Sequence, residues 1–286
     1  MTLAVSHSLS VAPPREATSI GRTAIRALYA ELALHPKPGL VSPLDSGSHD
    51  DMDMTTFMRS LFALRGYYRD IAAAGAAGAD FATLQALGIA AERRMLAATD
   101  GVNTHRGAVF CLGLLAAAAG WLRSRHKPLG GDALGVTVAT LWGTEIAAAA
   151  LPSHDSHGAR AARRYGARGA RQEAAEAFPT LFEVALPTFT STLDRLGCLE
   201  RTMVQTLFAL MATLEDTNLL HRGGPAGLAY VQAEARTFLD QGGVFRPGWR
   251  AAALAVHHAC VIRRLSPGGS ADMLAAAWFV HSQRVL

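Results

Sequence analysis

The segment HPKPGLVSPLDSGSHDDMD, residues 35–53, concentrates polar and turn-forming residues between two stretches rich in Ala and Leu. Lys37 stands between two prolines, in a stiff backbone. Three acids, Asp50, Asp51 and Asp53, stand at the start of an expected helix. One aspartate is a routine N-cap, but acids so close together repel one another unless a cation is present. Because Mg²⁺ binds one or two carboxylates together with substrate phosphates, the segment indicates either capping or metal binding.

The segment GVNTHRG, residues 101–107, precedes an apolar stretch. Thr104 is expected to be the N-cap of the helix that follows, which would leave backbone N–H groups free to bind an anion. Asn103, His105 and Arg106 would flank that point. A polar turn without function is the alternative interpretation.

The segment HDSHGARAARRYGARGAR, residues 154–171, is rich in arginine and punctuated by glycine. Arginines such as Arg168 can hold phosphates with two parallel hydrogen bonds. A solvated loop or a weak nucleic-acid patch is equally compatible with this composition. The segment lacks the interleaved aromatic residues typical of a base-stacking surface.

The segment LEDTNLLHRGG, residues 214–224, follows the apolar stretch MVQTLFALMATL, which predicts a helix ending there. A helix C-terminus carries partial negative charge and disfavours acids such as Glu215 and Asp216. Their position therefore indicates a bound cation or base catalysis, with Asn218 and Arg222 nearby; a solvent-facing turn is the alternative.

The segment SPGGSADMLA, residues 266–275, forms a turn that leads into a helix. Ser270 is expected to cap this helix and Asp272 to lie in its first turn. Glycines allow close approach of the backbone to a phosphate, although the spacing is not that of a Walker A loop.

Periodic apolar residues predict helices throughout and no strand, which indicates an all-α protein with one compact, bundle-like domain over residues 18–286. The site would lie at helix ends and in loops, and residues 1–17 would form a flexible tail. A domain boundary within 152–172 is the alternative. The expected helices span residues 18–34, 54–75, 81–99, 106–123, 132–151 (capped by Asp132), 173–195, 199–214, 226–241, 248–263 and 270–283.

The composition is that of a folded chain with a large core, because 50% of the 286 residues are hydrophobic and 17% are charged. Three scattered cysteines are expected to be reduced, in a cytoplasmic protein. The N-terminus does not resemble a signal peptide, and the apolar run 107–122 is shorter than the roughly 20 residues that span a membrane. The residues alone therefore indicate a Mg²⁺-assisted enzyme acting on a phosphorylated ligand, without defining the reaction.

Taken in order, the five segments resemble the triphosphoribosyl-dephospho-CoA synthase family. The matching stretches are Glu31-x5-KPGLV with GSHDDMD, GVNTHRGAVFCLGLL, YGARGARQEA, LMATLEDTNLLHRGG and SPGGSADMLA. Together they extend from about residue 20 to residue 283. Within the family, GLVSPLDSGSHDDMD looks more like the malonate-decarboxylase branch than the citrate-lyase branch, which tends to read GLVD followed by NGAH.

The resemblance implies an all-α enzyme with ATP and 3′-dephospho-CoA as substrates and Mg²⁺ as cofactor. The 2′-hydroxyl of the CoA ribose would attack C1 of the ATP ribose, and adenine would leave. The product would be the prosthetic-group precursor of an acyl carrier protein. It would pass to a holo-acyl-carrier-protein synthase acting on a decarboxylase carrier subunit, with no nucleic acid or membrane involved.

The resemblance and this chemistry together predict the site. Asp50, Asp53 and Asp216 are the expected catalytic and metal-binding carboxylates, and Asp272 is a further metal ligand. Glu31 and His105 are the candidates for proton transfer. The expected substrate-binding residues are Lys37, Gly39, His49, Asn103, Thr104, Arg106, Arg168, Asn218, Arg222, Gly223, Gly269 and Ser270.

Two other functions fit parts of this pattern. A Mg²⁺-dependent nucleotide hydrolase or an ADP-ribose-type glycohydrolase would use the same acids, with water in place of the ribose hydroxyl. A helical nucleic-acid-binding module would use the arginine-rich segment and would bind with a steep salt dependence. It would leave the acids at residues 50–53 and 216 unexplained.

Overall fold

The computed structural model describes residues 15–149 and 157–285. Within these ranges the chain folds into helices and contains no strand, so the expected all-α class is confirmed. The helices are α1 (Arg15–Leu32), α2 (Met54–Ala76), α3 (Phe81–Ala98), α4 (Arg106–Arg123), α5 (Ala133–Ala148), α6 (His157–Tyr165), α7 (Ala170–Ala175), α8 (Leu186–Leu196), α9 (Leu199–Thr213), α10 (Thr217–Asp240), α11 (Trp249–Ile262) and α12 (Gly268–Val285). A π-helical segment, η1 (Thr180–Ala185), precedes α8, and a short 3₁₀ segment, η2 (Gly243–Phe245), precedes α11.

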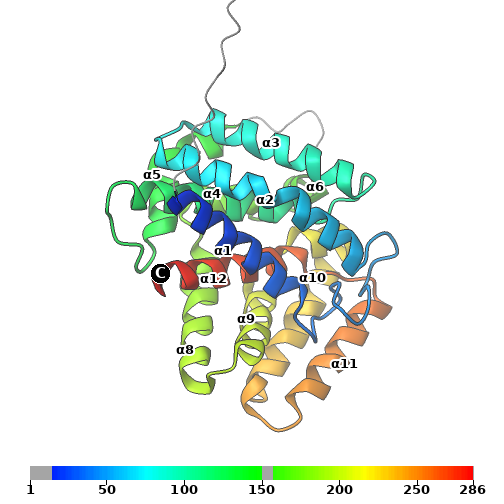
Figure 1. Ribbon diagram of the computed structural model, residues 1–286. Helices are drawn as coiled ribbons and strands as arrows, with labels where there is room; N and C mark the ends of the chain where they lie inside the picture. The colour runs from blue at the N-terminus through cyan, green and yellow to red at the C-terminus, as the bar shows by residue number, and fades with distance from the viewer. Residues whose placement is uncertain (1–14, 150–156, 286) are drawn as a thin grey trace, which may run out of the picture.

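Helix α12 lies between two groups of helices. In Figure 1, α2 to α5 lie above α12 and α8 to α11 lie below it. Helix α1 crosses the first group and packs against both α2 and α12. The segment between α1 and α2, residues 33–53, is named here the Lys37 loop. It reaches the connection between α11 and α12, so residues far apart in sequence meet at this end of the molecule.

Helix α4 is the central helix of the upper group. It is apolar on nearly all sides, and most of its residues from Ala108 to Leu122 are buried. It is also the one helix of the described residues that is long and apolar enough to cross a membrane, yet 72% of that stretch is buried inside the protein. The prediction that residues 107–122 form a buried core helix is confirmed, and such burial is typical of a core helix rather than a span.

Glycines allow α2 and α4 to approach each other closely. A Cβ atom at Gly75 would lie 2.0 Å from the carbonyl oxygen of Ala117, and one at Gly120 would lie 2.0 Å from that of Ala72. Both distances are far below van der Waals contact, so only glycine fits at these positions. The C-terminal halves of α2 and α4 are thereby held together.

Several predicted helix ends need correction. Helix α1 begins at Arg15, so residues 15–17, expected in the flexible tail, are helical; residues 1–14 lie outside the described ranges. Asp132 occupies the N-cap position of α5 but its side chain makes no capping hydrogen bond. The arginine-rich segment forms α6, which packs against α10 with Ala161 buried and its arginines exposed, whereas residues 150–156 lie outside the described ranges.

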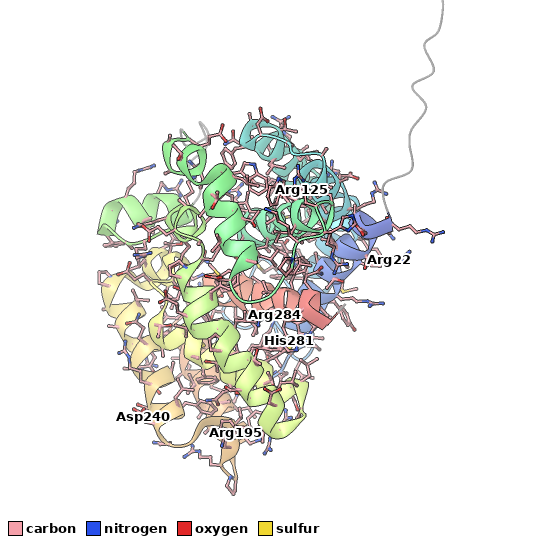
Figure 2. All side chains as sticks on the ribbon, turned by 90° about the vertical axis from the view of Figure 1, so that its left-hand side faces the viewer. Arg22, Arg125, Arg195, Asp240, His281 and Arg284 are labelled. Atoms are coloured by element: carbon pink, nitrogen blue, oxygen red, sulfur yellow. The ribbon has the colours of Figure 1, made fainter. Side chains whose placement is uncertain are left out.

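The C-terminal turns of α12 secure the opposite end of the molecule. Figure 2 shows His281 and Arg284 on this side, away from the Lys37 loop. The ring of His281 packs against Phe189 of α8, and the Arg284 guanidinium donates to the carbonyl of Gly131 before α5. Helix α12 is thus held at both of its ends.

The contact between α2 and α4 can be tested with two glycine substitutions in one helix. Gly75→Ala is expected to lower the free energy of unfolding by about 1–3 kcal/mol, because a methyl group has no space there. Gly66→Ala is the matched control in α2, since the atoms nearest to its Cβ lie 3.8 Å and 3.9 Å away. It should raise stability by about 0.5–1 kcal/mol through helix propensity. Urea unfolding measures both, and equal stabilities of the two variants would contradict the close approach.

Candidate active site

A buried ion pair lies where the Lys37 loop leaves α1. The Nζ atom of Lys37 is 2.7 Å from Oε1 of Glu31, and Lys37 is 1% exposed. Burial lowers the pKa of Lys37, although the charge of Glu31 opposes this effect. Because a buried ammonium is costly without a partner, Lys37 and Glu31 depend on each other.

Asp216 joins the N-termini of α10 and α12. It is the N-cap of α10, and its Oδ1 accepts from the backbone N–H of Asn218 at 2.9 Å. Its Oδ2 accepts from the backbone N–H of Ser270 at 2.9 Å and from the Ser270 hydroxyl at 3.1 Å. Asp216 is 1% exposed, and burial raises its pKa even though these hydrogen bonds oppose the rise. Two helix dipoles and several donors therefore face one carboxylate.

Two predictions about this region were wrong in local structure. Asp216 was expected at an unfavourable helix C-terminus, but the chain turns at Leu214 and Asp216 begins the next helix, where an acid is favourable. Ser270 was expected to cap α12, but that helix begins at Gly268 and the Ser270 hydroxyl donates to Asp216 instead.

Asp272 lies against the N-terminus of α4. A Cβ atom at Gly107 would be 1.9 Å from Oδ2 of Asp272, and the backbone N–H of Ala108 donates to this carboxylate. Burial, then the negative charges of Glu31 and Asp216, raise the pKa of Asp272 well above its usual value. Asp272, Glu31 and Asp216 are thus close enough to repel one another.

The site therefore contains more buried acids than bases. Three carboxylates lie close together, because the charges of Glu31 and Asp216 act on Asp272, and Lys37 pairs with Glu31. Part of this excess is balanced by the N-terminal ends of α4, α10 and α12, which converge here. The remaining negative charge would be balanced by a cationic ligand, or by a metal ion that is bound to a polyanionic ligand.

His105 adds a neutral ring next to this group. Its Nδ1 lies 2.6 Å from the hydroxyl of Ser60, while its Nε2 is buried and has no hydrogen-bond partner among the residues that the structure describes. Burial, and then the charge of Lys37, lower the pKa of His105 to about 3. The ring is therefore uncharged at neutral pH, and its Nε2 can form a hydrogen bond but is a weak base.

The predicted cluster of Asp50, Asp53 and Asp216 is not formed. Asp50 is 80% exposed and lies 3.1 Å from Nη2 of Arg264, in a surface ion pair. Asp53 is an exposed N-cap of α2 that accepts from the backbone N–H of Thr56 at 2.8 Å, and hydrogen bonds from Thr56 lower its pKa. No group of three metal-ligating side chains occurs in the described ranges. Helix capping, the alternative interpretation, explains Asp53.

Comparison with known proteins identifies the family of this chain. The sequence model of the family described as ATP:dephospho-CoA triphosphoribosyl transferase matches residues 17–286. The chain belongs to this family. No solved structure is detectably similar to it.

Relatives in the triphosphoribosyl transferase family match over most of their length. A 2-(5''-triphosphoribosyl)-3'-dephosphocoenzyme-A synthase of Klebsiella pneumoniae is 41% identical over 278 residues, which cover 94% of this chain and 92% of the relative. A probable synthase of the same name from Vibrio cholerae is 37% identical over 92% of this chain and 87% of its own length. One from Salmonella typhimurium is 42% identical, with 89% and 87% covered.

His49 and Arg222, both predicted to bind substrate, contact each other. Nη2 of Arg222 lies 3.0 Å from Nδ1 of His49, and Nη1 donates to the carbonyl of Ser48 at 3.0 Å. Nε2 of His49 lies 2.9 Å from the hydroxyl of Ser266. Burial, followed by the charge of Arg222, lowers the pKa of His49 to about 4. These contacts join the Lys37 loop to α10 and to the start of α12.

The predicted glycines and Asn218 lie where chain segments meet. Gly39 has a φ of +66°, and a Cβ atom there would be 2.0 Å from the carbonyl oxygen of Leu265. A Cβ atom at Gly269 would be 3.1 Å from Oδ1 of Asp216, and one at Gly223 would be 2.6 Å from the Leu265 side chain. The amide of Asn218 faces Gly268, where a Cβ atom would lie 2.8 Å from its Nδ2.

The N-terminus of α4 differs from the prediction. Helix α4 begins at Arg106, whose backbone N–H is capped by Oδ1 of Asn103 at 3.2 Å. The expected cap, Thr104, has a buried hydroxyl with no partner in the described part of the chain. The side chain of Arg106 turns to Glu92, with Nε 3.0 Å from Oε2.

Arg168 lies beside a small cavity of about 200 Å³ next to Glu215. Its backbone N–H donates to Oε2 of Glu215 at 2.8 Å, and its guanidinium contacts Glu176 and lies 4.0 Å from Glu173. The charge of Arg168 is thus balanced by neighbouring acids.

Three residues next to the site are not among those predicted from the sequence: Ser60, which contacts His105, and His257 with Asp45, whose Oδ1 lies 3.3 Å from Nε2 of His257. Ser60 is an ordinary helix residue in sequence and gave no signal. His257 is 2.8 Å from the carbonyl oxygen of Lys37 and belongs to a His-His pair inside an apolar helix, which is an unusual composition that could have drawn attention.

The raised pKa of Asp272 predicts that its charge destabilises the fold. In the unfolded chain an aspartate has a pKa of about 3.9, whereas folded Asp272 holds its proton to higher pH. The native state therefore binds more protons, and wild-type stability should fall as the pH rises from about 4 towards the folded pKa. Asp272→Asn cannot ionise, so its melting temperature should exceed that of wild type increasingly over this interval.

Asp240→Asn, an exposed acid at the end of α10, is the matched control and should show no such trend. For a chain of this size, each kcal/mol corresponds to about 2–4 °C in melting temperature. A constant difference between Asp272→Asn and wild type from pH 4 to pH 8 would contradict the argument.

Proposed function

We propose that this chain transfers the 5-triphosphoribosyl group of ATP to the 2′-hydroxyl of 3′-dephospho-CoA and releases adenine. The observation that supports the proposal best is the buried group of Glu31, Lys37, Asp216 and Asp272 at three helix N-termini. Membership in the triphosphoribosyl transferase family gives the reaction, and this group supplies charges of the kind the reaction requires.

The reaction makes one bond and breaks another at C1 of the ATP ribose. The bond between C1 and the adenine nitrogen breaks, and the sugar passes through an oxocarbenium-like state with positive charge, as in glycosidases. The ribose oxygen of dephospho-CoA then forms the new bond to C1 and loses its proton to a base, while adenine gains a proton. Asp216 or Asp272 would stabilise the positive charge, and Glu31 is the candidate base.

The triphosphate stays on the transferred sugar and must be held throughout. Lys37, Arg222 and the N-terminal N–H groups of α4 and α12 are the candidate partners for its oxygens. Asp272 with Asp216 would hold Mg²⁺, since two carboxylates plus phosphate oxygens are a suitable ligand set, and the ion would neutralise the triphosphate. His105, through its unpartnered Nε2, would orient a substrate atom.

The product would be the precursor of the prosthetic group carried by an acyl carrier protein, and a holo-acyl-carrier-protein synthase would be the next enzyme. The stretch GLVSPLDSGSHDDMD supports the malonate-decarboxylase branch. In this stretch the Ser42 hydroxyl accepts a hydrogen bond from the backbone N–H of Leu44 at 3.2 Å. An aspartate carboxylate at this position would also accept this hydrogen bond. A cytoplasmic location remains part of the proposal.

The reaction is tested by following adenine from ATP and Mg²⁺ with and without 3′-dephospho-CoA. Adenine release is expected only when dephospho-CoA is present, together with a product whose mass equals the two substrates minus adenine. Release of phosphate or adenine without dephospho-CoA would favour the hydrolase or glycohydrolase instead. Tight, steeply salt-dependent binding to nucleic acid would favour the third function.

The role of the buried acids is tested by Asp216→Asn, with Asp240→Asn as control at the other end of the same helix. Asp216→Asn should lower the rate of adenine release by at least about 100-fold, the typical effect of losing one preorganised charged partner. Asp240→Asn should leave it unchanged, because this residue is exposed and far along α10. Wild-type rates for Asp216→Asn would remove Asp216 from the mechanism.

A further inference from the structure

Helix α11 contacts the Lys37 loop through a buried histidine that none of the substrate-binding segments contains. His257 is 3% exposed and lies between the backbone of Lys37 and the side chain of Asp45. We propose that His257, in its doubly protonated form and paired with Asp45, is a positioning residue that fixes Lys37 for the reaction. The inference rests on the proposed function, because Lys37 is assigned there to the triphosphate.

The protonation of His257 follows from what each ring nitrogen faces. Nδ1 lies 2.8 Å from the carbonyl oxygen of Lys37, which can only accept, so Nδ1 must carry a hydrogen. Nε2 lies 3.3 Å from Oδ1 of Asp45. A lone pair on Nε2 would face the negative carboxylate, whereas an N–H would bind it. A proton on Nε2 would turn this contact into an ion pair, and this is the form that the proposal assigns to His257.

The charged groups around His257 are compatible with this form. Asp45 belongs to the Lys37 loop and is 39% exposed, so it keeps its own contact with water. The ring of His35 lies 6.2 Å away, and burial lowers the pKa of His35, which keeps that ring neutral. His258 is exposed, and Arg250 of α11 forms an ion pair with Glu200, in which Nη2 lies 2.5 Å from Oε1.

The hydrogen bond from His257 acts on Lys37, whose ammonium is assigned to the triphosphate. Lys37 is flanked by prolines, so its own backbone has little freedom, and its carbonyl receives the hydrogen bond directly. The same residue places its ammonium 2.7 Å from Glu31. A movement of the loop at this carbonyl would therefore be passed on to the ion pair. Arg250 of α11 also donates to the carbonyl of His35 at 3.3 Å, whereas the contacts of the loop with α10 and with the α11–α12 connection act further along, at Ser48 and His49.

The test compares two amides that replace different ring nitrogens. His257→Asn places an N–H group near the position of Nδ1 and can still donate to Lys37, whereas His257→Gln places it near Nε2. His257→Gln is expected to lower kcat/KM for adenine release about 10–100-fold. This is the size of effect typical of losing a residue that orients a ligand-binding side chain through a hydrogen bond. His257→Asn should recover most of this loss, and His258→Asn is the matched control at the exposed neighbouring position. The loss should lie mainly in kcat, since Lys37 must be aligned in the transition state.

A second measurement reports the charge itself. ¹⁵N NMR of histidine-labelled protein at pH 7 should show both nitrogens of His257 protonated, with the signals assigned by their absence in the variants. Asp45→Asn, which keeps the size of the side chain, should reduce the protonated fraction and the activity together. Asp45→Asn replaces His257→Gln in the activity test if circular dichroism shows that His257→Gln does not fold.

The outcomes separate this inference from the proposed function. The inference would be overturned by a neutral His257 ring, or by equal activities of wild type, His257→Asn and His257→Gln. Adenine release by wild type would in that case leave the proposed function intact. Absence of adenine release from wild type with dephospho-CoA would overturn the function and, with it, the positioning role, even if the ring proves charged.

Discussion

The burial of unequal numbers of acids and bases is the constraint on which the rest of the structure depends. Glu31, Asp216 and Asp272 lie together with Lys37 as the single cationic side chain among them. Such a group is tolerated because the N-termini of α4, α10 and α12 meet there and present N–H groups to the carboxylates. The helices are thus arranged around a charge distribution as much as around an apolar core.

This constraint also explains why the site forms only in the complete fold. Glu31 and Lys37 are neighbours in sequence, but Asp216 also needs Ser270 of α12, and the partner of Asp272 comes from α4. The Lys37 loop is in turn bound to α10, α11 and the connection to α12. Loss of one of these contacts would leave a buried charge or N–H group unpaired, so packing and function are coupled here.

The sequence predicted the fold class and most helices, because apolar periodicity reports directly on which face is buried. It failed where one residue had two plausible local roles. Asp216 could end one helix or begin the next, and only the turn at Leu214 decides this. The acids at positions 50 and 53 looked like a metal cluster, but exposure and capping account for them. Helix α6 was missed because its many arginines suggested a loop, although the helix packs against α10 and buries Ala161.

The partners of the two buried aspartates suggest different roles for them. Asp216 accepts from Asn218 and twice from Ser270, which occupies much of the hydrogen-bonding capacity of its two oxygens. Asp272 accepts from the backbone of Ala108 and retains partial exposure, so most of its lone pairs are available. A ligand cation or a developing positive charge would therefore meet Asp272 more readily, while Asp216 holds two helices in register. Burial raises the pKa of both aspartates, so the ionised form of each costs stability, which is typical of a site selected for function rather than stability.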